Sequence, residues 1–229
     1  MLTSGEWCEA RLGYRFGDPA LLDAALTHRS VGRANYERLE FLGDSVLNFA
    51  VAVLVYHAYP EADEGDLSRY RASLVSGQSL AEAASALGLG EQLRLGSGEL
   101  KTGGFRRSSI LADALEALFG AVYLDGGFDA ASSVIERLFA GRLAQLPEAR
   151  DLKDPKTRLQ ELLQGRGRRL PAYTVEDVSG EPHEHWFVAS CEVEELGLRE
   201  RGEGTSRRRA EQAAADRVLG QLSERGLDR

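Results

Sequence analysis

Three carboxylates recur at helical spacing in a stretch of the chain that is otherwise apolar. Residues 37–45 read Glu-Arg-Leu-Glu-Phe-Leu-Gly-Asp-Ser. Intervals of three and seven residues place Glu37, Glu40 and Asp44 on one face of a helix. Apolar neighbours predict that the adjoining surface is buried, and buried carboxylates without a counter-charge are costly. A bound cation would neutralise such a stripe.

A second apolar segment, residues 109–120, carries another pair of acids. Asp113 and Glu116 are one helical turn apart and face the same way, and Glu64 could supply a further carboxylate. Oxygen ligands suit Mg2+ or Mn2+, whereas zinc and non-haem iron sites usually recruit His or Cys. Charge runs also commonly lie on a solvated face. Spacing alone therefore leaves a metal site and a solvated surface both open.

The elements that would position these acids are helices. Apolar residues recur every three or four positions through the first two-thirds of the chain, without an alternating strand pattern. The predicted helices cover residues 19–27, 36–57, 66–75, 78–87, 108–124 and 128–145. We therefore expect an all-α domain over residues 1–146.

The pattern changes after a polar stretch, residues 147–153, which we interpret as a linker. Asp154 and Pro155 then supply an N-cap and a first helical residue. The expected elements are a helix to about residue 164, strands over 172–178, 185–193 and 197–204, and a helix over 206–222. This α-β-β-β-α order predicts a small α+β domain, residues 154–224, so the chain is multidomain.

The charge distribution bears on the partner. A net charge of -8 at first argues against nucleic acid, but residues 1–150 hold 14 Lys and Arg against 20 Asp and Glu, and residues 151–229 hold 14 against 16. The C-terminal part is thus the better anion binder. Arg207, Arg208 and Arg209 open its last helix, where cations oppose the macrodipole unless an anion binds. A solvated basic patch and a phosphate site both fit.

A glycine-rich loop between residues 95 and 109 carries three basic side chains. A nucleotide-binding P-loop would need Gly-Lys-Ser or Gly-Lys-Thr after a strand, but Lys101 follows Leu100 and no strand is predicted before it. We therefore expect no nucleotide cofactor. A plain surface loop and a loop that contacts a phosphate backbone both remain open.

The cysteines, the N-terminus and the longest apolar stretch bear on the cellular compartment of the protein. Cys8 and Cys191 are far apart and predict neither a disulfide nor a zinc site. The N-terminus lacks the pattern of a signal peptide, and the longest apolar stretch, residues 46–56, is shorter than the ~20 residues of a membrane span. We expect a soluble cytoplasmic protein without a membrane partner.

Taken together, these motifs resemble the bacterial ribonuclease III family of double-strand-specific endonucleases. Residues 37–45 resemble the family signature, and segments 63–68, 103–117 and 206–215 follow in the expected order. The resemblance spans roughly residues 16–222 and the two-domain form. It implies Mg2+-dependent hydrolysis, with Mn2+ as a substitute, of double-stranded RNA to 5′-phosphate and 3′-hydroxyl ends. The expected setting is processing of ribosomal, messenger and transfer RNA precursors.

The resemblance also implies roles for the acids. Mg2+ and the attacking water are held by four of them, Glu40, Asp44, Asp113 and Glu116, and Asp44 and Glu116 matter most for hydrolysis. Glu37 and Glu64 lie in the cleavage valley and assist substrate contacts or chemistry. All six positions match the family. That match argues against the alternative, a non-catalytic RNA-binding or ribosome-associated protein on the same fold.

Two further expectations concern partners. Each subunit would cut one strand, so the resemblance implies a homodimer, with Phe41 on the dimer surface; ordinary core packing is the other interpretation of Phe41. The C-terminal part resembles a domain that reads the shape of A-form RNA. The matching RNA contacts are Thr157, Gln160 and Glu161 in its first helix, His183 in a loop, and Ser206, Arg207 and Arg208 at its last helix. His183 by itself would be an ordinary surface histidine.

Overall fold

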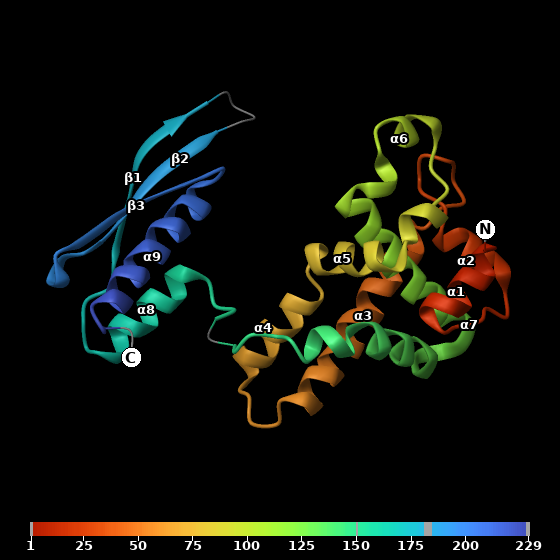
Figure 1. Cartoon of the computed structure of the whole chain (residues 1–229), viewed down its shortest axis with the longest axis horizontal. Coiled ribbons are helices and arrows are strands. Elements are labelled where there is room, and N and C mark those ends of the chain that lie inside the picture. The colour runs from red at the N-terminus through yellow and green to blue at the C-terminus, as the bar shows by residue number, and fades with distance from the viewer. Residues whose placement is uncertain (1, 150, 181–184, 228–229) are drawn as a thin grey trace. The chain divides into compact units, whose positions relative to one another are not determined.

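The chain divides into two units, Met1–Pro147 and Glu148–Arg229. The computed structural model describes residues 2–149, 151–180 and 185–227. The first unit is helical, and the second combines two helices with a three-stranded sheet (Figure 1). The predicted fold class, an all-α part followed by a small α-β-β-β-α part, is confirmed.

The helical unit begins with an element that we did not predict. Helix α1 (Ser4–Leu12) starts at a capping box, in which Thr3 and Glu6 satisfy each other's backbone amides. It ends at Gly13, whose positive φ of 63° suits glycine. The remaining helices are α2 (Pro19–Ala25), α3 (Glu37–Ala58), α4 (Glu64–Leu74), α5 (Gly77–Leu87), α6 (Ser97–Lys101) and α7 (Ser108–Leu143).

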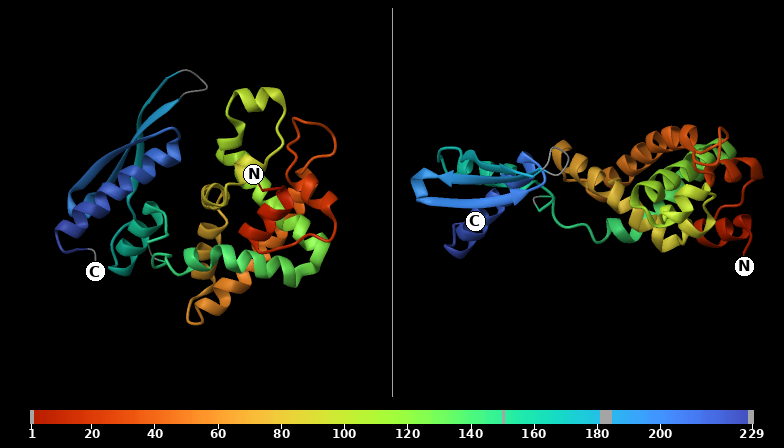
Figure 2. Two further views of the ribbon diagram at one scale, coloured as in Figure 1. Left: turned by 45° about the vertical axis from the view of Figure 1, so that its right-hand side comes forward. Right: turned by 90° about the horizontal axis from the view of Figure 1, so that it is seen from above.

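Helix α7 changes direction within its length, and its two halves diverge in both Figure 1 and Figure 2. The break is at Gly127, with φ 80° and ψ -176°, a conformation that a residue with a side chain avoids. The two helices predicted over 108–124 and 128–145 correspond to these halves. The first half is buried on nearly every side and forms the centre of the unit with α3.

Helix α3 is long and apolar enough to cross a membrane by length and composition, with a mean hydropathy of 1.6 over 18 residues. The prediction that no apolar segment reaches the length of a membrane span was therefore wrong, because the helix continues on both sides of residues 46–56. Core helices of soluble proteins pass the same test. Leu47, Ala50 and Val51 of α3 are fully buried inside the helical unit, as in such a core helix.

The second unit is an antiparallel sheet with both helices on one side (Figure 1). Its elements are α8 (Pro155–Gly165), β1 (Ala172–Ser179), β2 (Trp186–Val193), β3 (Leu198–Gly204) and α9 (Arg207–Glu224). Cys191 of β2 lies opposite Tyr173 of β1 and Glu200 of β3. Gly202 allows α9 to approach closely, since a Cβ there would lie 2.1 Å from the amide nitrogen of Ala214.

Candidate active site and nucleic-acid interface

Two glycines bring α3 and α7 into backbone contact. A Cβ added at Gly43 of α3 would lie 1.8 Å from the carbonyl oxygen of Glu116, and one at Gly120 of α7 would lie 2.2 Å from the carbonyl oxygen of Leu39. Any larger side chain would push the helices apart. The acids that flank these glycines along both helices therefore meet at the crossing.

Three of the predicted ligands come together there. One carboxylate oxygen each from Glu40, Asp113 and Glu116 lies within 4.8 Å of the others, and all three residues are partly buried. These are hard oxygen donors, which are the ligands that Mg2+ and Mn2+ prefer. The donor set therefore fits a divalent cation of this kind.

The pKa values of these acids also fit a site for a cation. Burial, with the nearby carboxylates of Asp44, Asp113 and Glu40, raises the pKa of Glu116 to about 8. Burial and the charge of Asp113 also raise the pKa of Glu40. Burial raises the pKa of Asp113, although His28 and Arg29 act against the shift. A cation would favour the charged form of each group.

The other predicted acids lie at different distances from this group. Asp44 is close enough to raise the pKa of Glu116, but its carboxylate accepts a 2.9 Å hydrogen bond from Nδ2 of Asn48. Glu37, the first residue of α3, forms an exposed ion pair with Arg29 at 3.5 Å. Glu64 begins α4 and accepts a hydrogen bond from Ser68. Among the described residues, Glu64 belongs to neither the carboxylate group nor the adjoining cavity.

A cavity of about 260 Å³ opens beside the carboxylates. Glu37, Glu40 and Asp113 form its acidic side. Its remaining lining residues are His28, Arg29, Tyr36, Glu99, Arg107, Ser109 and Ile110. Acidic and basic groups thus share one cavity, which could take a cation and a phosphate side by side.

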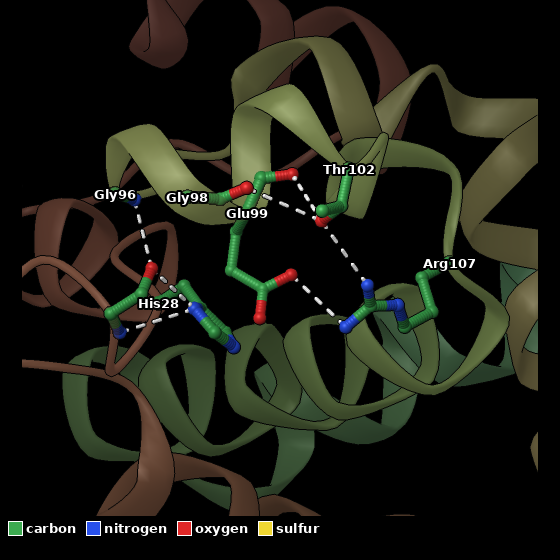
Figure 3. Close-up of polar contacts among 7 residues, drawn as sticks. His28, Gly96, Gly98, Glu99, Thr102 and Arg107 are labelled. Carbon is green, nitrogen blue, oxygen red and sulfur yellow. Dashed lines mark hydrogen bonds and ion pairs between the residues drawn. The ribbon is translucent and has the colours of Figure 1, made fainter.

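The far wall of this cavity is held by contacts that the sequence did not predict (Figure 3). Nδ1 of His28 accepts the amide of Ser30, and the Ser30 hydroxyl accepts the amide of Gly96 at 2.8 Å. Arg107 pairs with Glu99 at 3.0 Å. Only the fold brings the segment of His28 and Ser30 beside Gly96.

The predicted RNA contacts of the second unit lie in the first two turns of α8 and at the start of α9. Thr157 bonds the N-cap residue Asp154 through both its amide and its hydroxyl. Spacings of three and four residues place Thr157, Gln160 and Glu161 on one face of α8. At α9, Ser206 is the N-cap and both Arg207 and Arg208 are exposed. His183 lies outside the described residues.

A stripe of aromatic side chains on α3 is largely exposed, although the ring of Phe49 also lies 5.1 Å from that of Phe128 in α7. Phe41, Phe49 and Tyr56 are 79%, 59% and 64% exposed. Their spacings of eight and seven residues keep them on one face of the helix. Core packing, the alternative interpretation of Phe41, is therefore wrong for this unit.

Known proteins share this architecture. The crystal structure of the nuclease domain of ribonuclease III from Campylobacter jejuni has a TM-score of 0.60 and 41% identity, and the match covers 64% of this chain and 100% of that one. A second structure of that domain, described as flexible in a region involved in dimer formation, has a TM-score of 0.58 and 44% identity over 59% of this chain and 96% of its own.

Similarity at the sequence level extends over both units. The family described as Ribonuclease-III-like matches residues 18–143, and the double-stranded RNA binding motif matches residues 155–222. Proteins named Ribonuclease 3 from Alkalilimnicola ehrlichii and Aromatoleum aromaticum are 55% and 56% identical, over 98% and 92% of this chain and 99% and 94% of theirs. The chain therefore belongs to the ribonuclease III family of endoribonucleases that act on double-stranded RNA.

Proposed function

We propose that the helix crossing of the first unit is the centre that hydrolyses double-stranded RNA, with Mg2+ as the cofactor and Mn2+ as a substitute. The observation that carries this proposal is the meeting of Glu40, Asp113 and Glu116 within 4.8 Å. The products carry 5′-phosphate and 3′-hydroxyl ends. Ribosomal and other structured precursor RNAs in the cytoplasm are the proposed substrates.

The chain's own residues have distinct tasks in this proposal. Glu40, Asp113 and Glu116 would hold the cation, and Asp44, whose carboxylate bonds Asn48, is the proposed fourth ligand. A bound divalent cation supplies an activated water and neutralises charge on the phosphate. Glu37 stays at the cavity edge beside Arg29 and assists substrate placement. Glu64 remains a proposed contributor on the strength of the family resemblance alone.

The two units divide the work. We place the nuclease domain at residues 1–146, a linker at 147–153 and the RNA-binding domain at 154–224. Thr157, Gln160 and Glu161 meet one minor groove, and Ser206, Arg207 and Arg208 grip phosphates across the major groove. His183 is proposed to enter the next minor groove.

A homodimer completes the proposal, because cutting both strands needs two centres. The exposed aromatic stripe of Phe41, Phe49 and Tyr56 supports it, since large apolar patches commonly mark contact surfaces. Phe41 is the most exposed of the three and is the proposed centre of the contact.

The deciding experiment compares the wild type with Glu116→Ala on a long RNA duplex, with Mg2+ and with EDTA. Cleavage by the variant is expected to fall by more than the roughly 10- to 100-fold that changes beside a metal centre cost, while duplex binding is retained. Glu136→Ala, an exposed acid further along α7, is the matched control and should cleave normally.

Each outcome is informative. Undiminished cleavage by Glu116→Ala at saturating Mg2+ would reject the assignment of the centre. Binding without any cleavage by the wild type would instead favour a non-catalytic RNA-binding protein with an acidic cleft.

A further inference from the structure

A buried carboxylate lies among the cations at the start of α9. Glu211 is only 6% exposed. Its Oε1 accepts a hydrogen bond from Nε of Arg207 at 2.8 Å, and its Oε2 accepts one from Nζ of Lys156 at 2.5 Å. A buried charge is tolerated when hydrogen-bonded partners neutralise it. Both oxygens of Glu211 meet that condition.

The contact with Lys156 joins the two helices of the second unit. Lys156 belongs to the first turn of α8, directly before Thr157, and its ammonium also lies 4.2 Å from the ring centre of Tyr173. Glu211 therefore links the start of α8 with the start of α9. Of the proposed RNA contacts, Thr157 lies at the first of these places, and Ser206, Arg207 and Arg208 lie at the second.

A second link runs in parallel with the first. Asp154, the N-cap of α8, bonds Thr157, and hydrogen bonds from Thr157 and Gln212, with the charge of Arg208, hold its pKa below the ordinary value despite partial burial. Gln212 follows Glu211 on α9. Two neighbouring acid-centred contacts thus fix the helix starts relative to each other.

The exposed end of Arg207 can still bind a phosphate. Its side chain is 68% exposed even though Nε is engaged by Glu211. The guanidinium is planar with a fixed fork of donors, so a bond at Nε sets the direction of the remaining nitrogens. Because the side chain is largely exposed, a phosphate can accept hydrogen bonds from those nitrogens.

Charge alone would disfavour an acid in this position. Phosphate attraction grows with local positive charge, and Glu211 removes one unit of it beside Arg207. Any gain in RNA affinity from Glu211 must therefore come from geometry, because a side chain that is already held in place loses less conformational entropy when RNA binds.

We propose that Glu211 is a positioning residue for double-stranded RNA, which holds Arg207 and Lys156 so that the starts of α8 and α9 meet the RNA as one preformed surface. This inference rests on the proposed phosphate contact of Arg207.

The test measures duplex binding by the full chain in EDTA, where no cleavage is expected, over a range of salt concentrations. Glu211→Gln keeps the shape and removes the negative charge. If Glu211 positions Arg207, the affinity of this variant for the duplex should fall about three- to tenfold. The slope of log affinity against log salt concentration should become shallower by less than ~0.9, which is the contribution of one phosphate contact. A pure charge effect predicts tighter binding and a steeper slope. Asp216→Asn, an exposed acid on α9, controls for net charge.

The double variant identifies the route of the effect. Arg207→Ala should weaken binding, and adding Glu211→Gln to it should cost less than Glu211→Gln costs in the wild type, because only Lys156 then remains to be positioned. Thermal melting of each variant separates loss of folding from loss of affinity.

A second substitution does not depend on the folding of Glu211→Gln. Arg207→Lys keeps the charge but lacks Nε and the fixed fork, so it should lose most of what Arg207→Ala loses, whereas Arg208→Lys should lose less. Two results would overturn the positioning role and leave the RNA-binding function intact. One is wild-type affinity in Arg207→Lys. The other is unchanged or tighter binding by folded Glu211→Gln when Arg207→Ala binds more weakly than the wild type. Wild-type affinity in Arg207→Ala would overturn the phosphate contact itself, and the inference with it.

Discussion

Glu116 is the residue whose surroundings most strongly favour the neutral form. Its pKa rises from 4.5 to about 8 because it is buried beside other carboxylates. The folded protein without metal therefore binds a proton at neutral pH that the unfolded chain releases. Stability from this group is present below the unfolded value and is lost as the pH rises through the folded value.

This fall in stability with rising pH gives a prediction for the metal-free protein in EDTA. The melting temperature should decline between about pH 5 and pH 8, and Glu116→Gln should decline less, because its amide does not ionise. Saturating Mg2+ should reduce the wild-type decline by favouring the charged form. Melting curves at matched ionic strength provide the measurement. Parallel declines for the two proteins in EDTA would contradict the assigned shift.

Residues differ in how far the sequence reveals them. The acids of the centre stand out because helical spacing is a local property, so Glu40 and Glu116 could be named before the fold was known. Ser30 and Glu211 could not, because their partners Gly96 and Lys156 are distant in sequence. The sequence also did not predict that Asp44 bonds Asn48.

At the scale of elements, the contact between α3 and α7 determines whether the acids meet. Gly43→Ala should separate the helices, since its Cβ would lie 1.8 Å from a backbone oxygen that cannot rotate away. We expect a destabilisation of about 1–3 kcal/mol or more, together with weaker Mg2+ binding. Chemical denaturation and calorimetric titration measure the two effects.

Gly141→Ala is the matched control for that substitution. Gly141 is a helical glycine of α7 with nothing within 4 Å of an added Cβ. Alanine there should be neutral or stabilise by about 0.5–1 kcal/mol, because it favours helix. Equal behaviour of the two variants would reject steric contact as the reason for Gly43.

The elements were largely readable because their signals are local. The apolar period and the Asp154-Pro155 start predicted α8, and Gly126 and Gly127 separated the halves of α7. Helix α1 was missed although Thr3 and Glu6 carry a recognisable capping box, because the segment lacks a clear apolar period. The approach of Gly43 to Glu116 could not be predicted, since backbone contacts between helices depend on the whole unit.

For the whole molecule, the exposed aromatic stripe of α3 gives a prediction about assembly. Phe41→Asp should shift the protein from dimer to monomer, because burying a charge at an apolar contact is costly. The variant should also lose paired cleavage of both strands. Sedimentation velocity and duplex cleavage mapping measure these changes.

Leu170→Asp, a similarly exposed apolar residue of the second unit, is the control and should remain dimeric. A wild type that sediments as a monomer at assay concentration, or a dimeric Phe41→Asp, would remove Phe41 from the proposed contact.

Gly43 and Gly120 contribute space rather than a functional group. A survey of side chains that meet a reactant would omit both. Inherited changes at these positions should behave as temperature-sensitive lesions that stabilising changes elsewhere in the chain can suppress, whereas loss of Glu116 should stay inactive at every growth temperature. Genetics could therefore distinguish the architecture of this centre from its chemistry.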